Sequence, residues 1–180
     1  MRIPGSVEIS ECGGCGRACG CKPAVAPVLV LAIGNPLMAD DGAGQELLAK
    51  LQSAGPWDAR VEFVDGGTQG LALLGQFENR RAVLFLDAVR LGKPAGSVHE
   101  LQQQQLIRMG SRATSAHEGS APDILKALEL LGETPAEVAL VGIEPEKIQT
   151  GIGLSPAVRD GLEQAAGLAA SAIDRILSAL

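Results

Sequence analysis

The stretch Val28-Leu-Val-Leu-Ala-Ile33, followed by Gly34, decides the fold class. A continuous apolar run closed by a glycine is typical of a strand that is covered on both faces, as in the middle of a parallel sheet. A second run of this kind, Ala82–Leu86, ends at Asp87. Strands buried on both faces need helices on either side of the sheet, so these two segments predict an α/β protein.

The segments between and after these runs alternate between strand and helix patterns. Further strands are predicted at 61–64, 97–101 and 137–143, and helices at 44–54, 71–78, 121–131 and 156–180. The last helix begins at the N-cap pair Ser155-Pro156. Its residues expected to face the sheet are Leu162, Ala166, Ala169, Ile173, Ile176 and Leu180. The order predicts a three-layer αβα sandwich with a mostly parallel five-stranded sheet. The glutamines 102–105 are interpreted as a polar surface stretch.

Composition excludes some partners. The chain has 180 residues, which suits one domain or one domain with a tail. Aromatic residues make up only 2% of it, so a stacking surface for single-stranded nucleic acid is not expected. The net charge of -6 also argues against a basic phosphate-binding surface.

The N-terminal residues 1–25 differ from the remainder of the chain. They are rich in glycine and cysteine and lack hydrophobic periodicity, so we expect a flexible extension, with the compact domain at 26–180. Cys12, Cys15, Cys19 and Cys21 could bind zinc, nickel or an iron–sulfur cluster. Their spacing fits no standard pattern closely, so reduced thiols without a metal remain the alternative. Because neither a secretory signal nor a membrane-spanning segment is evident, a cytoplasmic protein without membrane insertion is predicted.

Acidic residues stand at three predicted strand ends. Asp41 lies in the loop after the first strand, Asp65 ends the second, and Asp87 ends the third. The carboxyl ends of parallel strands are where ligands bind in such sheets, and a cation would relieve the repulsion between carboxylates there. For each aspartate alone, a helix cap or a turn is the alternative.

A histidine is the second indication of a metal site. His117 lies in a predicted loop before a helix that the Ser120–Asp123 capping box opens. One imidazole with two carboxylates could hold a borderline divalent metal and leave coordination positions open. The alternative is an exposed loop histidine, and His99, within a predicted strand, is expected to be structural or exposed.

Common enzyme motifs are missing from the sequence. There is no Gly-x-Ser-x-Gly elbow, no phosphate-binding Gly-x-x-x-x-Gly-Lys-Ser/Thr loop and no His-Glu-x-x-His pair. The two adjacent aspartates in the loop after Gly34 would repel a pyrophosphate, so a dinucleotide site is not expected either.

The motifs together resemble the nickel-iron hydrogenase maturation endopeptidases over roughly residues 27–178. The motifs that carry the resemblance occur in this order: Gly34-Asn-Pro-Leu-x-x-Asp-Asp-Gly-x-Gly44, Asp65-Gly-Gly-Thr68, Asp87-Ala88, Ser115-Ala-His117, Val141-Gly-Ile-Glu-Pro145 and Gly153-Leu-Ser-Pro156. The cysteines of the extension are not part of the resemblance.

The resemblance implies a protease that removes a C-terminal extension from a hydrogenase large-subunit precursor once nickel has been inserted. It assigns nickel binding to Asp41, Asp87 and His117, although some members have Glu in place of Asp41. Asp41 and Asp65 are the expected catalytic or orienting groups. The hypothesis is that the nickel belongs to the substrate, and a monomer is expected. The alternative is a non-proteolytic metal-sensing or metal-handling accessory protein; a general metallopeptidase with its own metal is a weaker third.

Overall fold

The computed structural model describes residues 25–109 and 120–180, so the predictions for His117 and the four cysteines lie outside the described residues. At its centre is a five-stranded sheet with the strand order β2-β1-β3-β5-β4. The strands, in chain order, are β1 (Val28–Ala32), β2 (Val61–Asp65), β3 (Ala82–Ala88), β4 (Val98–Gln102) and β5 (Glu137–Ile143). Only β4 is antiparallel to its neighbour, so within the described part of the chain the predicted mostly parallel sheet is confirmed.

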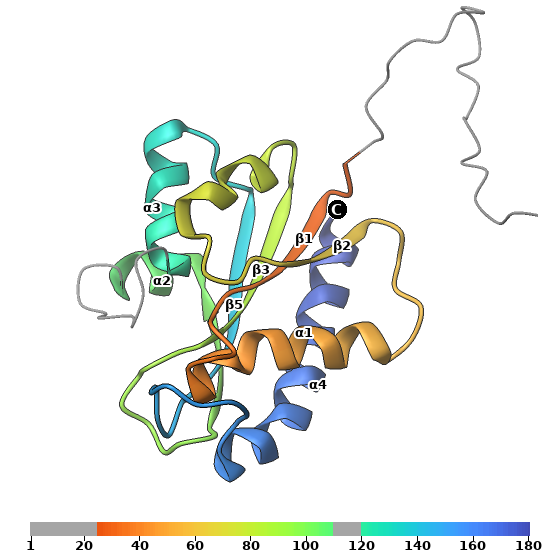
Figure 1. The fold of residues 1–180 in the computed structure, drawn as a ribbon. Coiled ribbons are helices and arrows are strands. Elements are labelled where there is room, and N and C mark those ends of the chain that lie inside the picture. Colours follow the sequence, from red (N-terminus) through yellow and green to blue (C-terminus); the bar gives the residue numbers. More distant parts are fainter. Residues whose placement is uncertain (1–24, 110–119) are drawn as a thin grey trace, which may run out of the picture.

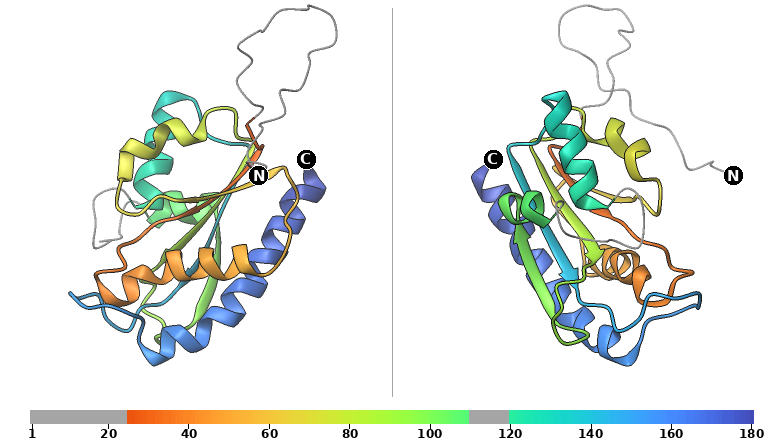
Figure 2. Two further views of the ribbon diagram at one scale, coloured as in Figure 1. Left: turned by 45° about the vertical axis from the view of Figure 1, so that its right-hand side comes forward. Right: turned by 90° about the vertical axis from the view of Figure 1, so that its left-hand side faces the viewer.

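Helices cover both faces of this sheet (Figure 1 and Figure 2). On one face lie α1 (Ala43–Ser53) and α4 (Pro156–Ala179). On the other lie the 3₁₀ segment η2 (Gly70–Phe77), α2 (Gln103–Met109) and α3 (Ala121–Leu131). Successive residues of the central strands alternate between these two cores, because side chains of a strand point to opposite faces. The predicted three layers are therefore confirmed.

The glutamines 102–105 lie largely at the surface, as expected, but sequence analysis did not predict the helix α2 that begins among them. Gln102 ends β4, and Gln103 begins α2. The backbone N–H of Gln102 donates to Oε1 of Gln105 at 2.9 Å, while Leu106 is completely buried. One buried leucine in a seven-residue helix gives too little hydrophobic periodicity for sequence analysis to detect.

The terminal helix lies closer to the sheet than its large residues suggest. Ala169, Ile173 and Ile176 are buried as expected, whereas Leu162, Ala166 and Leu180 are only partly buried at the edge of the contact. Small residues, Gly161, Ala165 and Ala172, occupy the buried face instead. At Gly161 a Cβ would lie 2.4 Å from the carbonyl oxygen of Gly96, so glycine is required for this close approach.

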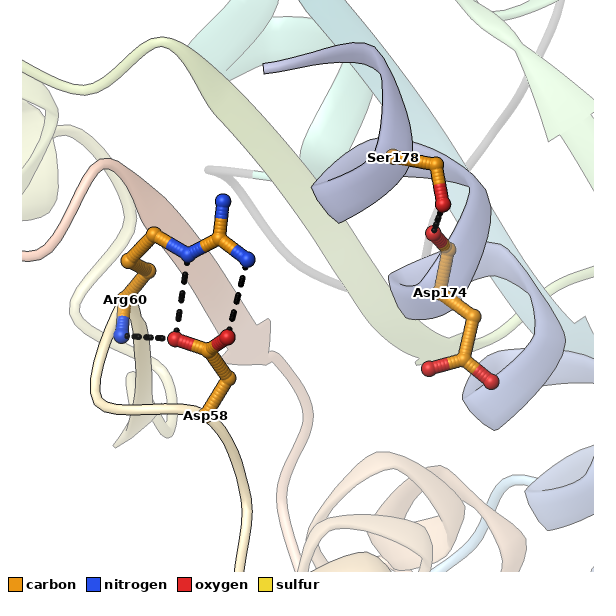
Figure 3. A network of polar contacts seen from close by, with 4 residues as sticks. All are labelled: Asp58, Arg60, Asp174 and Ser178. Atoms are coloured by element: carbon orange, nitrogen blue, oxygen red, sulfur yellow. Dashed lines mark hydrogen bonds and ion pairs between the residues drawn. The ribbon is translucent and has the colours of Figure 1, made fainter.

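Polar contacts fix the turn that leads into β2 and the last turns of α4 (Figure 3). The guanidinium of Arg60 donates to both carboxylate oxygens of Asp58, at 3.1 and 2.8 Å, and its backbone N–H adds a third bond at 2.8 Å. In α4 the Ser178 hydroxyl donates to the Asp174 carbonyl oxygen at 2.7 Å. Both are exposed surface features, and the Asp58–Arg60 contact precedes the start of β2, the opposite end of the strand from Asp65.

The sheet reverses its strand order between β1 and β3. The chain leaves β1, passes through α1 to β2 on one side, and returns through η2 to β3 on the other side of β1. Such a reversal opens a crevice beyond the carboxyl ends of the two strands, and this is where open α/β sheets bind ligands. Among the described helices, none is long and apolar enough to span a membrane.

Candidate functional site

Two acidic residues flank the switch point between β1 and β3. Asp41 lies in the short 3₁₀ segment η1 (Ala39–Gly42), which follows β1 by a six-residue loop, and Asp87 is the penultimate residue of β3. Gly44 brings α1 directly over the two strand ends, because a Cβ there would lie 2.5 Å from the carbonyl oxygens of both Ile33 and Leu86. The glycine thus allows the loop with Asp41 to lie beside the end of β3.

Asp41 is held in a defined orientation within its loop. Its side chain is buried, and its Oδ2 accepts a hydrogen bond from the backbone N–H of Asn35 at 2.6 Å. The loop turns at Gly34, whose φ of +136° favours glycine and whose Cβ would lie 2.0 Å from the carbonyl oxygen of Asp41. The first glycine of the motif is therefore needed for the path of the backbone around Asp41.

Asp40, the neighbour of Asp41, is a structural residue that sequence analysis did not separate from it. It is fully buried, and its carboxylate accepts bonds from the backbone N–H groups of Glu146, Lys147 and Ser155 at 2.9, 3.0 and 2.6 Å, and from the Ser155 hydroxyl at 2.9 Å. Burial alone would raise the pKa of Asp40, but these four hydrogen bonds outweigh it and lower the pKa. Asp40 thereby joins the loop of Asp41 to the start of α4.

The carboxyl group of Asp87 is in an unfavourable environment for its charge. Burial raises the pKa of Asp87 well above its ordinary value, and the negative charge of Asp41 raises it further, against a small lowering by the Ala88 backbone N–H. Because η1 packs against β3, the charges of Asp41 and Asp87 lie near enough to interact. The structure therefore brings together two of the three predicted metal ligands.

Asp65 lies at the same edge of the sheet, at the end of β2, and the strand β1 separates it from Asp87 on β3. In the strand register Ala32 pairs with both Asp65 and Leu86, so Asp65 stands level with the residue before Asp87. Its side chain is exposed, and its Oδ1 accepts bonds from the Gly67 backbone N–H at 3.0 Å and from Nε2 of Gln45 at 3.3 Å. The part of Asp65 in the site rests on this shared position at the edge of the sheet.

Among residues 25–109 and 120–180, no three His, Cys, Asp or Glu side chains gather into a group that could hold a metal. The two close carboxylates, Asp41 and Asp87, thus need a further ligand from elsewhere. His117 and the four cysteines, the other residues assigned to metal binding, lie outside the described residues. Where His117 lies relative to the two carboxylates stays a prediction.

Glu144 is a second buried acid that sequence analysis did not single out, although it belongs to the Val141–Pro145 motif. Its carboxylate accepts the backbone N–H groups of Leu91 and Gly92 at 2.7 and 3.2 Å. Its own backbone pairs with Ser97 and Gly96, at 2.9 and 2.8 Å. Glu144 therefore holds the loop that follows β3 and Asp87. An acid that binds backbone groups some fifty positions away leaves no local signal in the sequence.

The comparison with protein families identifies the class. The family model described as hydrogenase maturation protease matches residues 45–172, which is well over half of the chain. The chain therefore belongs to the hydrogenase maturation protease family, and it is a hydrolase of the endopeptidase type, as the resemblance implied.

Individual relatives agree with this assignment. The chain is 33% identical over 154 residues to the hydrogenase 2 maturation protease of Escherichia coli, an alignment that covers 85% of this chain and 90% of the relative. Among solved structures, it is similar to the E. coli hydrogenase maturating endopeptidase HybD with a TM-score of 0.76 and 32% identity, over 82% of this chain and 92% of that one. The HybD protease of Thermococcus kodakarensis gives a TM-score of 0.66 at 28% identity, over 80% and 97% of the two chains.

Proposed function

We propose that this protease removes the C-terminal extension of a nickel-iron hydrogenase large-subunit precursor, and that it recognises nickel in the precursor through Asp41, Asp87 and His117. The observation that carries the proposal is the approach of two carboxylates, Asp41 and Asp87, at the switch point of the sheet. The name of the E. coli relative, a hydrogenase 2 maturation protease, supports the substrate class.

The repulsion between Asp41 and Asp87 gives nickel recognition a physical basis. Asp41 is buried, Asp87 is partly buried, and the charge of Asp41 raises the pKa of Asp87, so a cation bound between them would stabilise both charged groups. An imidazole as the third ligand suits nickel, which accepts nitrogen and oxygen donors. In the sequence, His117 comes three residues before Ser120, the N-cap of α3. The helix α3 packs on the same face of the sheet as Phe85, which is two residues before Asp87 on β3 and points to the same face.

In this proposal the nickel belongs to the substrate and is not a resident cofactor of the protease. A precursor without nickel would leave the carboxylate pair without its cation, and a precursor with nickel would supply it. Recognition of the metal and permission to cut would then be a single event. At such a site nickel can polarise the scissile carbonyl, activate a water or position the bond, and Asp65, at the same edge of the sheet, is the group proposed to accept or orient a proton.

A processing assay with matched histidine variants tests this proposal. Nickel-loaded and nickel-free precursors are incubated with the wild-type protein, His117→Ala and His99→Ala, and loss of the C-terminal peptide is followed by mass spectrometry. His99 is the control because it is not among the proposed ligands, its ring contacts the Ser97 hydroxyl at 3.0 Å, and β5 separates its strand β4 from Asp87 on β3. We expect the wild type and His99→Ala to cut only the nickel-loaded precursor, and His117→Ala to leave it uncut.

Two results would contradict the proposal. Cleavage of nickel-loaded precursor by His117→Ala at the wild-type rate would remove His117 from the site. Binding of the precursor by the wild type without any loss of mass would favour the non-proteolytic metal-handling alternative for this substrate.

A further inference from the structure

The side-chain amide of Gln45 connects two parts of the candidate site. Gln45 is the third residue of α1, and its Nε2 donates to the carbonyl oxygen of Gly34 at 3.0 Å and to Oδ1 of Asp65 at 3.3 Å. The backbone of the same region adds a bond from the Gly34 N–H to the Gly67 carbonyl oxygen at 3.1 Å. Through this one amide, α1 joins the loop that carries Asp41 to the end of β2.

The orientation of the amide is determined by its neighbours. With Nε2 facing two acceptor oxygens, the group cannot be reversed, since Oε1 would then face the Gly34 carbonyl and the Asp65 carboxylate. As a result Oε1 is buried, and no described residue donates to it. A buried acceptor without a donor is unfavourable for folding, so the amide is retained at a cost in stability. Residues that break a packing rule in this way occur most often where function requires them.

The contact with Gln45 changes what the Asp65 carboxylate can do. An exposed aspartate held only by the Gly67 N–H, two residues on, keeps a broad range of orientations about its last torsion. The second donor, from a different element, fixes Oδ1 on the side of α1. Oδ2 has no partner among the described residues, so it is the oxygen left to accept a proton or a hydrogen bond from a substrate.

We propose that Gln45 is a positioning residue of the proteolytic site, which orients the carboxylate of Asp65 relative to the loop of Asp41. The inference rests on the proposed role of Asp65 in cleavage. Gln45 acts through Asp65 and does not contribute to nickel recognition, because its amide contacts neither Asp41 nor Asp87 by any bond of the described structure. It therefore affects the rate of cleavage rather than the binding of the precursor.

The test compares Gln45→Met with Gln52→Met. Methionine keeps the length of the side chain and removes the amide, and Gln52 is an exposed glutamine of the same helix without a described side-chain hydrogen bond. With nickel-loaded precursor we expect kcat of Gln45→Met to fall by about 10- to 100-fold at unchanged KM, which is the loss of rate expected when a catalytic group is misoriented. Gln52→Met should keep both constants.

The melting temperature separates positioning from a structural role. Gln45→Met removes both a buried acceptor that lacks a donor and two hydrogen bonds, and these effects on stability oppose each other, so its Tm should stay close to that of the wild type while its kcat falls. A loss of kcat that accompanies a lower Tm would indicate a structural residue and overturn the inference. Gln45→Glu is the second variant: it replaces the donor by an acceptor beside two oxygens, so its kcat should fall at least as far.

A double-mutant cycle with Asp65→Asn distinguishes this inference from the proposed function. If Gln45 acts through Asp65, Gln45→Met causes no further loss of kcat in the Asp65→Asn background. If the two losses of kcat multiply in the double variant, the role of Gln45 is overturned and that of Asp65 is not. The same holds if Gln45→Met keeps the wild-type kcat while Asp65→Asn is defective. A wild-type kcat for Asp65→Asn would overturn both the proposed role of Asp65 and the inference.

Discussion

At the scale of single residues, the adjacent aspartates Asp40 and Asp41 have opposite tasks. Asp40 is buried with four hydrogen-bond donors and stabilises the protein, whereas Asp41 lies near a second carboxyl group, Asp87, whose charge it disfavours. The same chemical group is therefore structural at one position and costly at the next. What separates the two is their surroundings: backbone N–H groups of three residues face Asp40, whereas Asp41 lies near the carboxyl group of Asp87.

Replacement of Asp87 by asparagine should raise the stability of the protein and abolish its activity. Because burial and the charge of Asp41 raise the pKa of Asp87, the folded protein binds this proton more tightly than the unfolded chain does. Stability is therefore lost as the pH rises from the ordinary value of 3.8 to the raised pKa, and it stays reduced at neutral pH. At neutral pH we expect Asp87→Asn to raise the free energy of unfolding by on the order of 1 kcal/mol, and hence the melting temperature. The variant should fail in precursor processing.

Thermal unfolding over a pH series checks this expectation. The advantage of Asp87→Asn should shrink as the pH falls toward 3.8, where the wild-type carboxyl becomes protonated in both states. A variant less stable than the wild type at neutral pH would show that the charge of Asp87 is satisfied in the fold and would remove the electrostatic argument for a cation site.

Asp58 offers a pH-dependent contact with no part in the site. Hydrogen bonds from the Arg60 side chain and backbone lower the pKa of this exposed carboxyl to about 2. Since the folded pKa lies below the ordinary 3.8, the contact contributes stability above that value and loses it as the pH falls toward 2. We expect an NMR titration of Asp58 with a midpoint near 2 in the wild type. In Arg60→Gln the midpoint should move toward the ordinary value, with processing unchanged, and an unshifted midpoint would contradict the contact.

At the scale of elements, the strands could be predicted and one helix could not. The runs 28–33 and 82–86 are apolar on both faces because they pair on both sides and are covered by two layers, so each leaves a strong signal. The helix α2 escaped prediction because its stability depends on Leu106 alone among its buried residues. The antiparallel direction of β4 also follows from the connection through α2 and α3, which no local pattern reveals.

The candidate site was predictable to a similar, partial extent. Asp41, Asp65 and Asp87 follow apolar runs, so their place at one edge of the sheet could be inferred from chain order. The contacts of Asp40, Gln45 and Glu144 join positions 11 to 115 residues apart, and sequence analysis of a single chain carries no information on such pairs.

Two glycine substitutions in helices should have opposite effects. In Gly44→Ala the added Cβ meets two backbone carbonyl oxygens at 2.5 Å, neither of which can move without displacing a strand end. We expect a loss of about 3 kcal/mol and a loss of processing, because α1 is forced away from the switch point. Gly167→Ala in α4 meets no atom within 4 Å and should add about 0.5–1 kcal/mol of stability through helix propensity.

Chemical denaturation of both variants measures this difference directly. Gly167→Ala also serves as the control for activity, since it changes a helix away from the aspartates. Equal stabilities of the two variants would show that α1 does not require the close approach to β1 and β3.

At the scale of the whole molecule, hydrogen bonds to the carbonyl groups of residues 26 and 27 mark where the described domain begins. Nη1 of Arg80 donates to the carbonyl oxygen of Ala26 at 2.6 Å, and the Pro27 carbonyl accepts from the backbone of Arg81 and Ala82 at 2.8 and 3.1 Å. We propose that residues 1–25 are an extension outside this domain. Removal of these residues should leave the melting temperature and the processing of nickel-loaded precursor unchanged.

Metal and acid-labile sulfur analysis of both forms determines what the extension binds. Zinc, nickel or iron that is present in the full-length protein and lost on truncation would assign a metal to Cys12, Cys15, Cys19 and Cys21. Equal metal content would leave them as reduced thiols. Loss of processing on truncation would contradict the proposed division and assign the extension a part in cleavage.

The bond between Asp40 and Ser155 also sets the order in which the protease becomes competent during its own synthesis. The two residues lie 115 positions apart. At about 5–20 residues per second, a ribosome needs roughly 6–23 s to pass from one to the other. During that time the Asp40 carboxylate lacks the backbone groups that fix its loop. We therefore expect the cutting ability proposed here to begin only when the last helix has left the ribosome and folded onto the sheet.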